Sequence, residues 1–177
     1  MRARRKPWAA KELSTNENVI ENASEMKGRW KEFFGNENDI HVEIGCGKGR
    51  FIQQLAEQNP NLNYIAIEKE NNIIATAVRD ARELGRSIAF IVGDVKDLEN
   101  YFAPDEIKRI YINFCDPWHR KKKWSKRRLT HKNFLVIYER IFISGGEIFF
   151  KTDNKPLFEF SLNEFSNQGW QIGRAHV

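Results

Sequence analysis

The chain has 177 residues, of which 41% are hydrophobic, and this is enough for one domain with a buried core. It contains no apolar run near the ~18 residues of a membrane span, no signal-peptide core, and no zinc-site spacing between its two cysteines, Cys46 and Cys115. We therefore expect a cytoplasmic protein with no membrane contact, no metal and no disulfide framework.

Strand-like and helix-like patterns alternate along the chain. Residues 1–39 are predicted to be a basic N-terminal arm and a leading helix, with a modest helical pattern at 23–34. Strands are predicted at residues 40–44, 64–68, 88–92, 109–114 and 147–151, and helical patterns at 51–59, 73–84, 130–141 and 154–167, with a weak link at 98–102. Thr130 is the expected N-cap of the third helix. The alternation predicts an α/β fold, a doubly wound, mostly parallel sheet with helices on both faces.

A glycine-rich turn follows the first predicted strand. Glu43, Gly45, Gly47 and Gly49 form the pattern E-x-G-x-G-x-G at the carboxyl end of that strand, where open parallel sheets bind ligands. The dinucleotide fingerprint is G-x-G-x-x-G instead, and an acidic residue entering the turn would repel a phosphate. The pattern favours a ligand with a cationic end and no phosphate, namely S-adenosylmethionine.

Acidic side chains also follow the next two strands. Glu68 ends the second strand, where a carboxylate can accept both ribose hydroxyls, and Asp94 follows the third, where it can accept the adenine amino group. Either residue can instead cap a helix or face water. Three successive strands that end in carboxylates favour a binding site.

Residues 113–130, NFCDPWHRKKKWSKRRLT, join a strand to a block of positive charge. Seven Lys and Arg side chains at 120–128 raise the formal charge from −2 to +5, as in a surface that binds polyanions. The fourth strand lies beside the first in such a sheet, so Asp116 and Trp118 should face the methyl donor. Asp116 can accept hydrogen bonds from guanine, and Trp118 can stack on a base. The structural alternatives are a strand-ending turn with a packed tryptophan and a solvated charged loop.

These residues resemble the bacterial tRNA (guanine-N7)-methyltransferases over nearly the whole chain up to Trp170. The matching segments are residues 5–8, the glycine turn from Glu43, Glu68, the NFCDPW segment, 126–130 and 151–154. The resemblance implies a Rossmann-like methyltransferase sheet and transfer of a methyl group from S-adenosylmethionine to N7 of a guanine in tRNA.

The resemblance also implies roles for individual residues. The S-adenosylmethionine site would be lined by Glu43, Gly45, Gly47, Glu68, Asp94 and Asp116. Asp116 would be central to catalysis, and Arg120 or Lys121, together with Asp153, would contact the substrate. RNA would be held by Lys122, Lys123, Lys126, Arg127 and Arg128. Family members usually have about one residue fewer in this loop, so the choice between Arg120 and Lys121 stays open. Asp153 is also a candidate helix cap.

The chemistry favours the same function. Guanine N7 has an in-plane lone pair and no proton, so methyl transfer needs positioning more than a general base. A nearby carboxylate would stabilise the positive charge that develops on the base. Covalent catalysis by Cys115 is disfavoured, because this cysteine precedes Asp-Pro and does not follow a proline. The alternatives are an RNA-binding protein on a degenerate methyltransferase fold, or a methyltransferase for another RNA or a small molecule. The sequence does not decide between monomer and homodimer.

The last residues carry no strand pattern, although a sheet of this kind should continue after residue 167. Residues 172–177, IGRAHV, match one reading frame of a widely used sequencing adapter. We expect these residues to be an assembly artefact that follows a methyltransferase domain at 40–171. The sheet would then lack its last two strands and a Thr-x-x-Glu motif of the substrate site, which would impair folding or activity.

Overall fold

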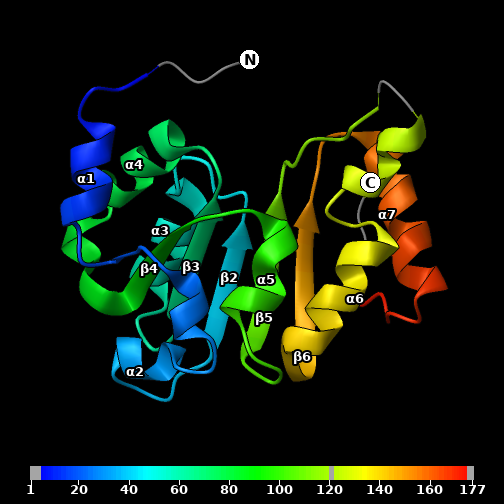
Figure 1. Ribbon diagram of the computed structural model, residues 1–177. Coiled ribbons are helices and arrows are strands. Elements are labelled where there is room, and N and C mark those ends of the chain that lie inside the picture. Colours follow the sequence, from blue (N-terminus) through cyan, green and yellow to red (C-terminus); the bar gives the residue numbers. More distant parts are fainter. Residues whose placement is uncertain (1–4, 120–121, 175–177) are drawn as a thin grey trace.

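The computed structural model describes residues 5–119 and 122–174 (Figure 1). In chain order, the elements are α1 (Ala9–Thr15), β1 (Val19–Ile20), η1 (Ala23–Met26), α2 (Trp30–Phe34), β2 (Ile40–Ile44), α3 (Arg50–Gln58), β3 (Asn63–Glu68), α4 (Asn71–Asp80), η2 (Arg82–Ser87), β4 (Ile88–Val92), η3 (Val95–Asp97), α5 (Leu98–Tyr101), β5 (Ile107–Asn113), η4 (Lys122–Arg127), α6 (Lys132–Ile141), β6 (Phe142–Lys151) and α7 (Lys155–Asn167). All five predicted strands are confirmed, two of them with the predicted bounds. The fifth begins earlier than predicted, at Phe142.

The strands form one parallel sheet in the order β1-β4-β3-β2-β5-β6. The sequence predicted that its first and fourth strands lie side by side. This is confirmed, because β2 pairs with β5 and Glu43 lies opposite Tyr111. Parallel strands all end at the same edge of the sheet, which is the upper edge in Figure 1. The turns that carry the predicted site residues therefore share this edge.

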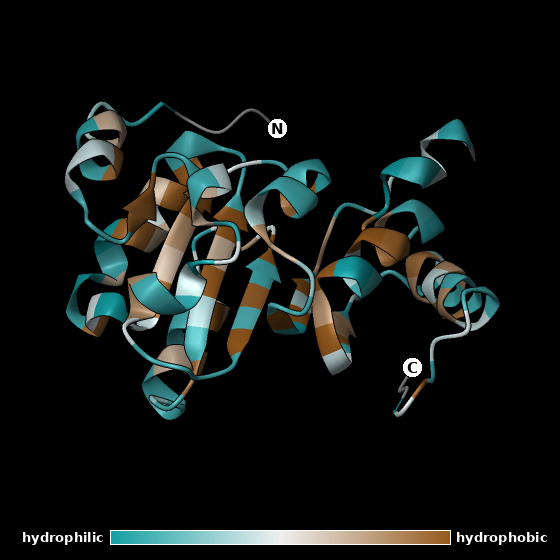
Figure 2. Cartoon of the chain, turned by 60° about the horizontal axis from the view of Figure 1, so that its bottom comes forward, coloured by the Kyte–Doolittle hydropathy of each residue, from teal (hydrophilic) through white to brown (hydrophobic). Residues whose placement is uncertain are grey.

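Helices cover both faces of the sheet, as predicted. On one face, Ile40, Val42 and Ile44 of β2 belong to a core that includes side chains of α2, α5, α6 and α7. On the other face, Tyr64 and Ala66 of β3 pack with side chains of α3 and α4. Figure 2 shows the apolar colour concentrated in the strands and the hydrophilic colour on the outer helices and loops. In the described ranges, no helix is both long and apolar enough to cross a bilayer.

The N-terminal segment contains more structure than its sequence pattern indicates. Helix α1 packs on α4, and β1 forms the edge of the sheet beside β4. The Trp8 ring contacts two cations, with Lys6 Nζ at 5.2 Å and Arg79 Cζ at 4.3 Å from the ring centroid. The buried Glu12 carboxylate pairs with the Arg82 guanidinium at 2.5 Å. These long-range contacts fix α1 on the domain.

Helix α6 is capped by His131, so the prediction that Thr130 caps it was wrong. His131 Nδ1 accepts a hydrogen bond from Asn133 N at 3.2 Å, and burial lowers the pKa of the ring, which favours the neutral acceptor. The Thr130 hydroxyl is buried and lies 2.6 Å from the hydroxyl of Ser161 on α7. The Thr130 hydroxyl therefore contacts a residue 31 positions away in the sequence instead of capping α6.

Candidate active site

The glycine turn after β2 opens onto free space. Gly45 and Gly47 have φ angles of 71° and 58°, in the left-handed region that favours glycine. A Cβ atom added to either residue would have no described atom within 4 Å. At Gly49, by contrast, an added Cβ would lie 2.7 Å from the Ala77 Cβ. The first two glycines thus leave room for a ligand, whereas the third allows α3 and α4 to pack closely.

Glu43 is buried two residues before this turn, with only 3% of its surface exposed. Its Oε1 accepts a hydrogen bond from Asn113 Nδ2 at 3.1 Å, while its Oε2 has no hydrogen-bond partner among the described residues. Burial raises the pKa of the Glu43 carboxyl to about 7, and the Asn113 hydrogen bond offsets only part of this rise. A buried carboxylate with an unused oxygen favours a cationic ligand.

The Glu68 carboxylate connects the end of β3 to the glycine turn. Its Oε2 accepts the Gly47 amide at 3.2 Å, and its Oε1 accepts the amides of Lys69 and Glu70 at 2.9 and 3.1 Å. These backbone bonds fix the direction of the carboxylate beside the open turn. A contact between Glu68 and a ribose stays a prediction.

Asp94 and Asp153 follow β4 and β6 at the same edge of the sheet. Asp94 Oδ1 caps η3 by accepting the Lys96 amide at 3.0 Å, so the capping alternative is confirmed for this residue. Asp153 does not cap α7, because Asn154 Oδ1 accepts the Leu157 amide at 2.8 Å and is the N-cap. Asp153 is exposed, and its substrate contact stays a prediction.

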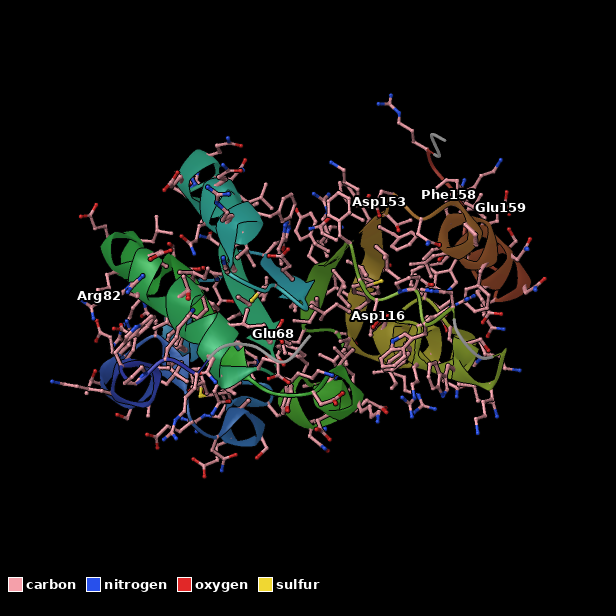
Figure 3. The ribbon with its side chains drawn as sticks, turned by 90° about the horizontal axis from the view of Figure 1, so that it is seen from above. Glu68, Arg82, Asp116, Asp153, Phe158 and Glu159 are labelled. Carbon is pink, nitrogen blue, oxygen red and sulfur yellow. The ribbon has the colours of Figure 1, made fainter. Side chains whose placement is uncertain are left out.

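The Asp116 corner, residues 114–118, has an unusual backbone. Phe114 and Trp118 have φ angles of 50° and 47°, although neither is glycine. The Trp118 amide donates a hydrogen bond to Asp116 Oδ1 at 2.9 Å. The Asp116 residue is exposed, so its carboxylate is accessible to a substrate. Figure 3, which looks down on the strand ends, shows Glu68, Asp116 and Asp153 distributed along this edge.

The basic run divides into exposed and folded-back side chains. Arg120 and Lys121, the two candidates for the substrate contact, lie outside the described residues, and Lys122 begins η4. The exposed cations of the described part are Lys123, Lys126 and Arg127. RNA contact by these side chains stays a prediction.

Two arginines of the run contact the Asp116 corner itself. Arg127 Cζ lies 4.9 Å from the centroid of the Trp118 ring and 5.6 Å from that of Trp124. Arg128 is half-buried, and its Nε donates a hydrogen bond to the Pro117 carbonyl at 2.8 Å. Trp118 is therefore packed against the basic run, as predicted by the alternative in which this segment is a strand-ending turn with a packed tryptophan.

Comparisons with known proteins agree with this geometry. Residues 37–172 match the protein family described as "Putative methyltransferase". A tRNA (guanine-N(7)-)-methyltransferase of Clostridioides difficile (strain 630) is 49% identical over 176 residues, covering 97% of this chain and 81% of the relative. Its counterpart from Bacillus subtilis (strain 168) is 47% identical over 171 residues, covering 96% and 80%. The chain belongs to the tRNA (guanine-N7)-methyltransferase family.

The fold of this family member is also found among solved structures. The structure described as "Structure of an Antibiotic Related Methyltransferase" has a TM-score of 0.62 and 19% identity, and covers 83% of this chain and 76% of its own. At this identity the likeness concerns the fold alone. The predicted Rossmann-like methyltransferase fold is confirmed.

Asn113 is a residue of the site that the sequence analysis did not single out. It is the last residue of β5, and its amide is the side-chain donor to the buried Glu43 carboxyl. The available signal was its place at a strand end, directly before the Asp116 corner and on the strand predicted to lie beside Glu43. The hydrogen bond from Arg128 to the Pro117 carbonyl was not predicted either, because the two residues are 11 positions apart in the sequence.

Proposed function

We propose that this protein transfers a methyl group from S-adenosylmethionine to N7 of a guanine in tRNA. One observation carries this proposal: the buried Glu43 carboxyl keeps an unused oxygen beside an open glycine turn, at the strand edge that also carries Asp116. A cationic ligand without phosphate satisfies that oxygen. The family relatives are named for this activity.

The donor side of the site is formed by three turns. When bound, S-adenosylmethionine supplies an electrophilic methyl group on a positively charged sulfur. Glu43, in its ionised form, attracts the cationic end of the donor, and Gly45 and Gly47 leave room for the donor beside the turn. Glu68, which three backbone amides leave with one free acceptor position on Oε2, accepts a ribose hydroxyl, and Asp94 accepts the adenine amino group through Oδ2, because its Oδ1 caps η3.

The acceptor side is built around Asp116. Its exposed carboxylate accepts hydrogen bonds from the amide and amino edge of guanine and turns N7 toward the donor. No proton has to leave N7, so the residue orients the base and stabilises its developing positive charge. Asp153 and either Arg120 or Lys121 contact the substrate nucleotide, and Lys123, Lys126 and Arg127 hold phosphates together with the N-terminal Arg5.

The decisive experiment identifies the modified nucleotide. Unmodified tRNA transcript is incubated with the protein and S-adenosylmethionine, digested, and analysed by mass spectrometry. We expect 7-methylguanosine at a defined position. A methyl group on another atom, or on no RNA at all, would contradict the assignment. Calorimetry without any heat of S-adenosylmethionine binding would favour the degenerate RNA-binding protein.

The exposed lysines of η4 give a second prediction. Lys123→Ala and Lys126→Ala should each weaken tRNA binding and lower the slope of log Kd against log salt by about 1, because each removes one phosphate contact. The measurement is a filter-binding series over salt concentration. The matched control is Lys31→Ala on α2, at the opposite edge of the sheet, which should leave the slope unchanged (Figure 1). Equal slopes for all three variants would place RNA elsewhere.

A further inference from the structure

The Asp116 corner needs support from outside its own sequence. Phe114 and Trp118 both adopt left-handed backbone conformations, which cost about 1–3 kcal/mol each and persist only where surrounding contacts impose them. On one side, the Phe114 amide donates a hydrogen bond to the Lys151 carbonyl of β6 at 2.8 Å. Within the corner, the Trp118 amide donates a hydrogen bond to Asp116 Oδ1. The peptide between Asp116 and Trp118 needs a separate anchor.

Arg128 provides that anchor. Its Nε donates to the Pro117 carbonyl at 2.8 Å, and Pro117 stands between Asp116 and Trp118. The Arg128 guanidinium lies 4.4 Å from the centroid of the Phe160 ring on α7. A cation that is half-buried between a carbonyl and an aromatic ring is oriented inward, whereas Lys123 and Lys126 of the same run are exposed.

The support continues into the helices behind the corner. Phe160 stacks on His131 with a ring distance of 6.3 Å and an interplanar angle of 19°. His131 caps α6, and α7 is joined to this region by the buried contact between Thr130 and Ser161. Figure 3 shows Asp116 on the same half of the molecule as Phe158 and Glu159, which mark α7. The corner is thus connected through Arg128 and Phe160 to the helices α6 and α7.

We propose that Arg128 is a positioning residue, which sets the direction of the Asp116 carboxylate by fixing the Pro117 peptide against Phe160. This proposal rests on the proposed function and changes the role of one residue that was predicted to contact RNA. The planar guanidinium is required, because it donates from Nε along a fixed direction while its face rests on the ring. A lysine keeps the charge but cannot make both contacts in this geometry.

The substitution Arg128→Lys therefore separates positioning from electrostatics. We expect kcat for methyl transfer to fall roughly 10–100-fold, since a small misplacement of a catalytic group has effects of this size. KM for tRNA and the salt slope of tRNA binding should not change, because the charge is retained. The matched control is Arg86→Lys, which alters another arginine over an aromatic ring, 5.7 Å from Phe33 and far from the corner. It should leave kcat unchanged.

A readout independent of activity completes the test. Hydrogen exchange of the Trp118 amide should be faster in Arg128→Lys than in the wild type and unchanged in Arg86→Lys. Phe160→Leu should act in the same direction, and the double variant should lose little more than Arg128→Lys alone. Should Arg128→Lys fail to fold, Phe160→Leu carries the same expectations.

Two results would overturn the proposal. One is wild-type kcat with unchanged Trp118 exchange in Arg128→Lys. The other is a lower salt slope and a higher KM at unchanged kcat, which would make Arg128 an RNA contact. Failure of the proposed function is distinguishable from both, because the wild-type chain would then form no 7-methylguanosine while the Trp118 exchange rates would still report on Arg128.

Discussion

Asp116→Ala is expected to lower kcat of methyl transfer by roughly 10²–10³-fold, the effect of removing one preorganised electrostatic contact to a developing charge. The tRNA should still bind, because the exposed cations of η4 are untouched. Single-turnover assays with radiolabelled donor measure the rate, and filter binding measures the affinity. Near-normal turnover would remove Asp116 from the catalytic role.

Asp116→Asn distinguishes the charge of this residue from its place in the turn. An asparagine oxygen can still accept the Trp118 amide, so the corner keeps its internal hydrogen bond. We expect this variant to be nearly as slow as Asp116→Ala, because the negative charge is lost. Wild-type activity would instead show that Asp116 serves only to form the turn. Asp80→Ala, which removes an exposed carboxylate at the end of α4, is the matched control and should be fully active.

Glu43→Gln is expected to weaken S-adenosylmethionine binding by roughly 10–100-fold at pH 8. The substitution removes the attraction between the buried carboxylate and the cationic donor, and such contacts contribute several kcal/mol at most. In the wild type the pKa of Glu43 is raised to about 7 by burial, so the carboxyl is largely protonated at pH 6 and ionised at pH 8. Donor affinity should therefore rise with pH across this range. Calorimetry at pH 6, 7 and 8 measures the trend, which should be absent in Glu43→Gln.

The same pKa predicts a change in stability of opposite sign. The folded-state pKa of Glu43 lies above its usual value of 4.5. The contribution of Glu43 to the free energy of unfolding is therefore fully present below pH 4.5 and is lost as the pH rises toward 7. In the absence of donor, Glu43→Gln should consequently raise Tm at pH 8. Glu57→Gln on the exposed side of α3 is the control, and it should retain both the wild-type Tm and the pH dependence of binding. A donor affinity of Glu43→Gln equal to that of the wild type would exclude Glu43 from the site.

The sequence was most informative where both faces of an element are buried. β4 is a short apolar run and β2 alternates apolar residues with His41 and Glu43, and in both cases glycine follows the pattern and marks its end. The two-residue strand β1 is too short for any periodicity to be visible. Helix α1 was missed because it is fixed by contacts such as Glu12 with Arg82, which lie 70 residues apart.

The site was predictable in outline for a topological reason. Parallel strands end at one edge, so Glu43, Glu68 and Asp116 could be placed together from their positions at or just beyond the carboxyl ends of strands. Their partners could not be predicted. The bond of Asn113 to Glu43 depends on strand register, and that of Arg128 to Pro117 depends on how the loop after the corner folds back.

The three amides that bond Glu68 have a consequence for ligand exchange. One carboxylate joins the turn after β2 to the turn after β3, so the frame of the proposed donor site is set when the protein folds. The conformational entropy of ordering these turns is lost during folding and not during binding. We therefore expect donor and spent product to replace one another without rearrangement of these two turns.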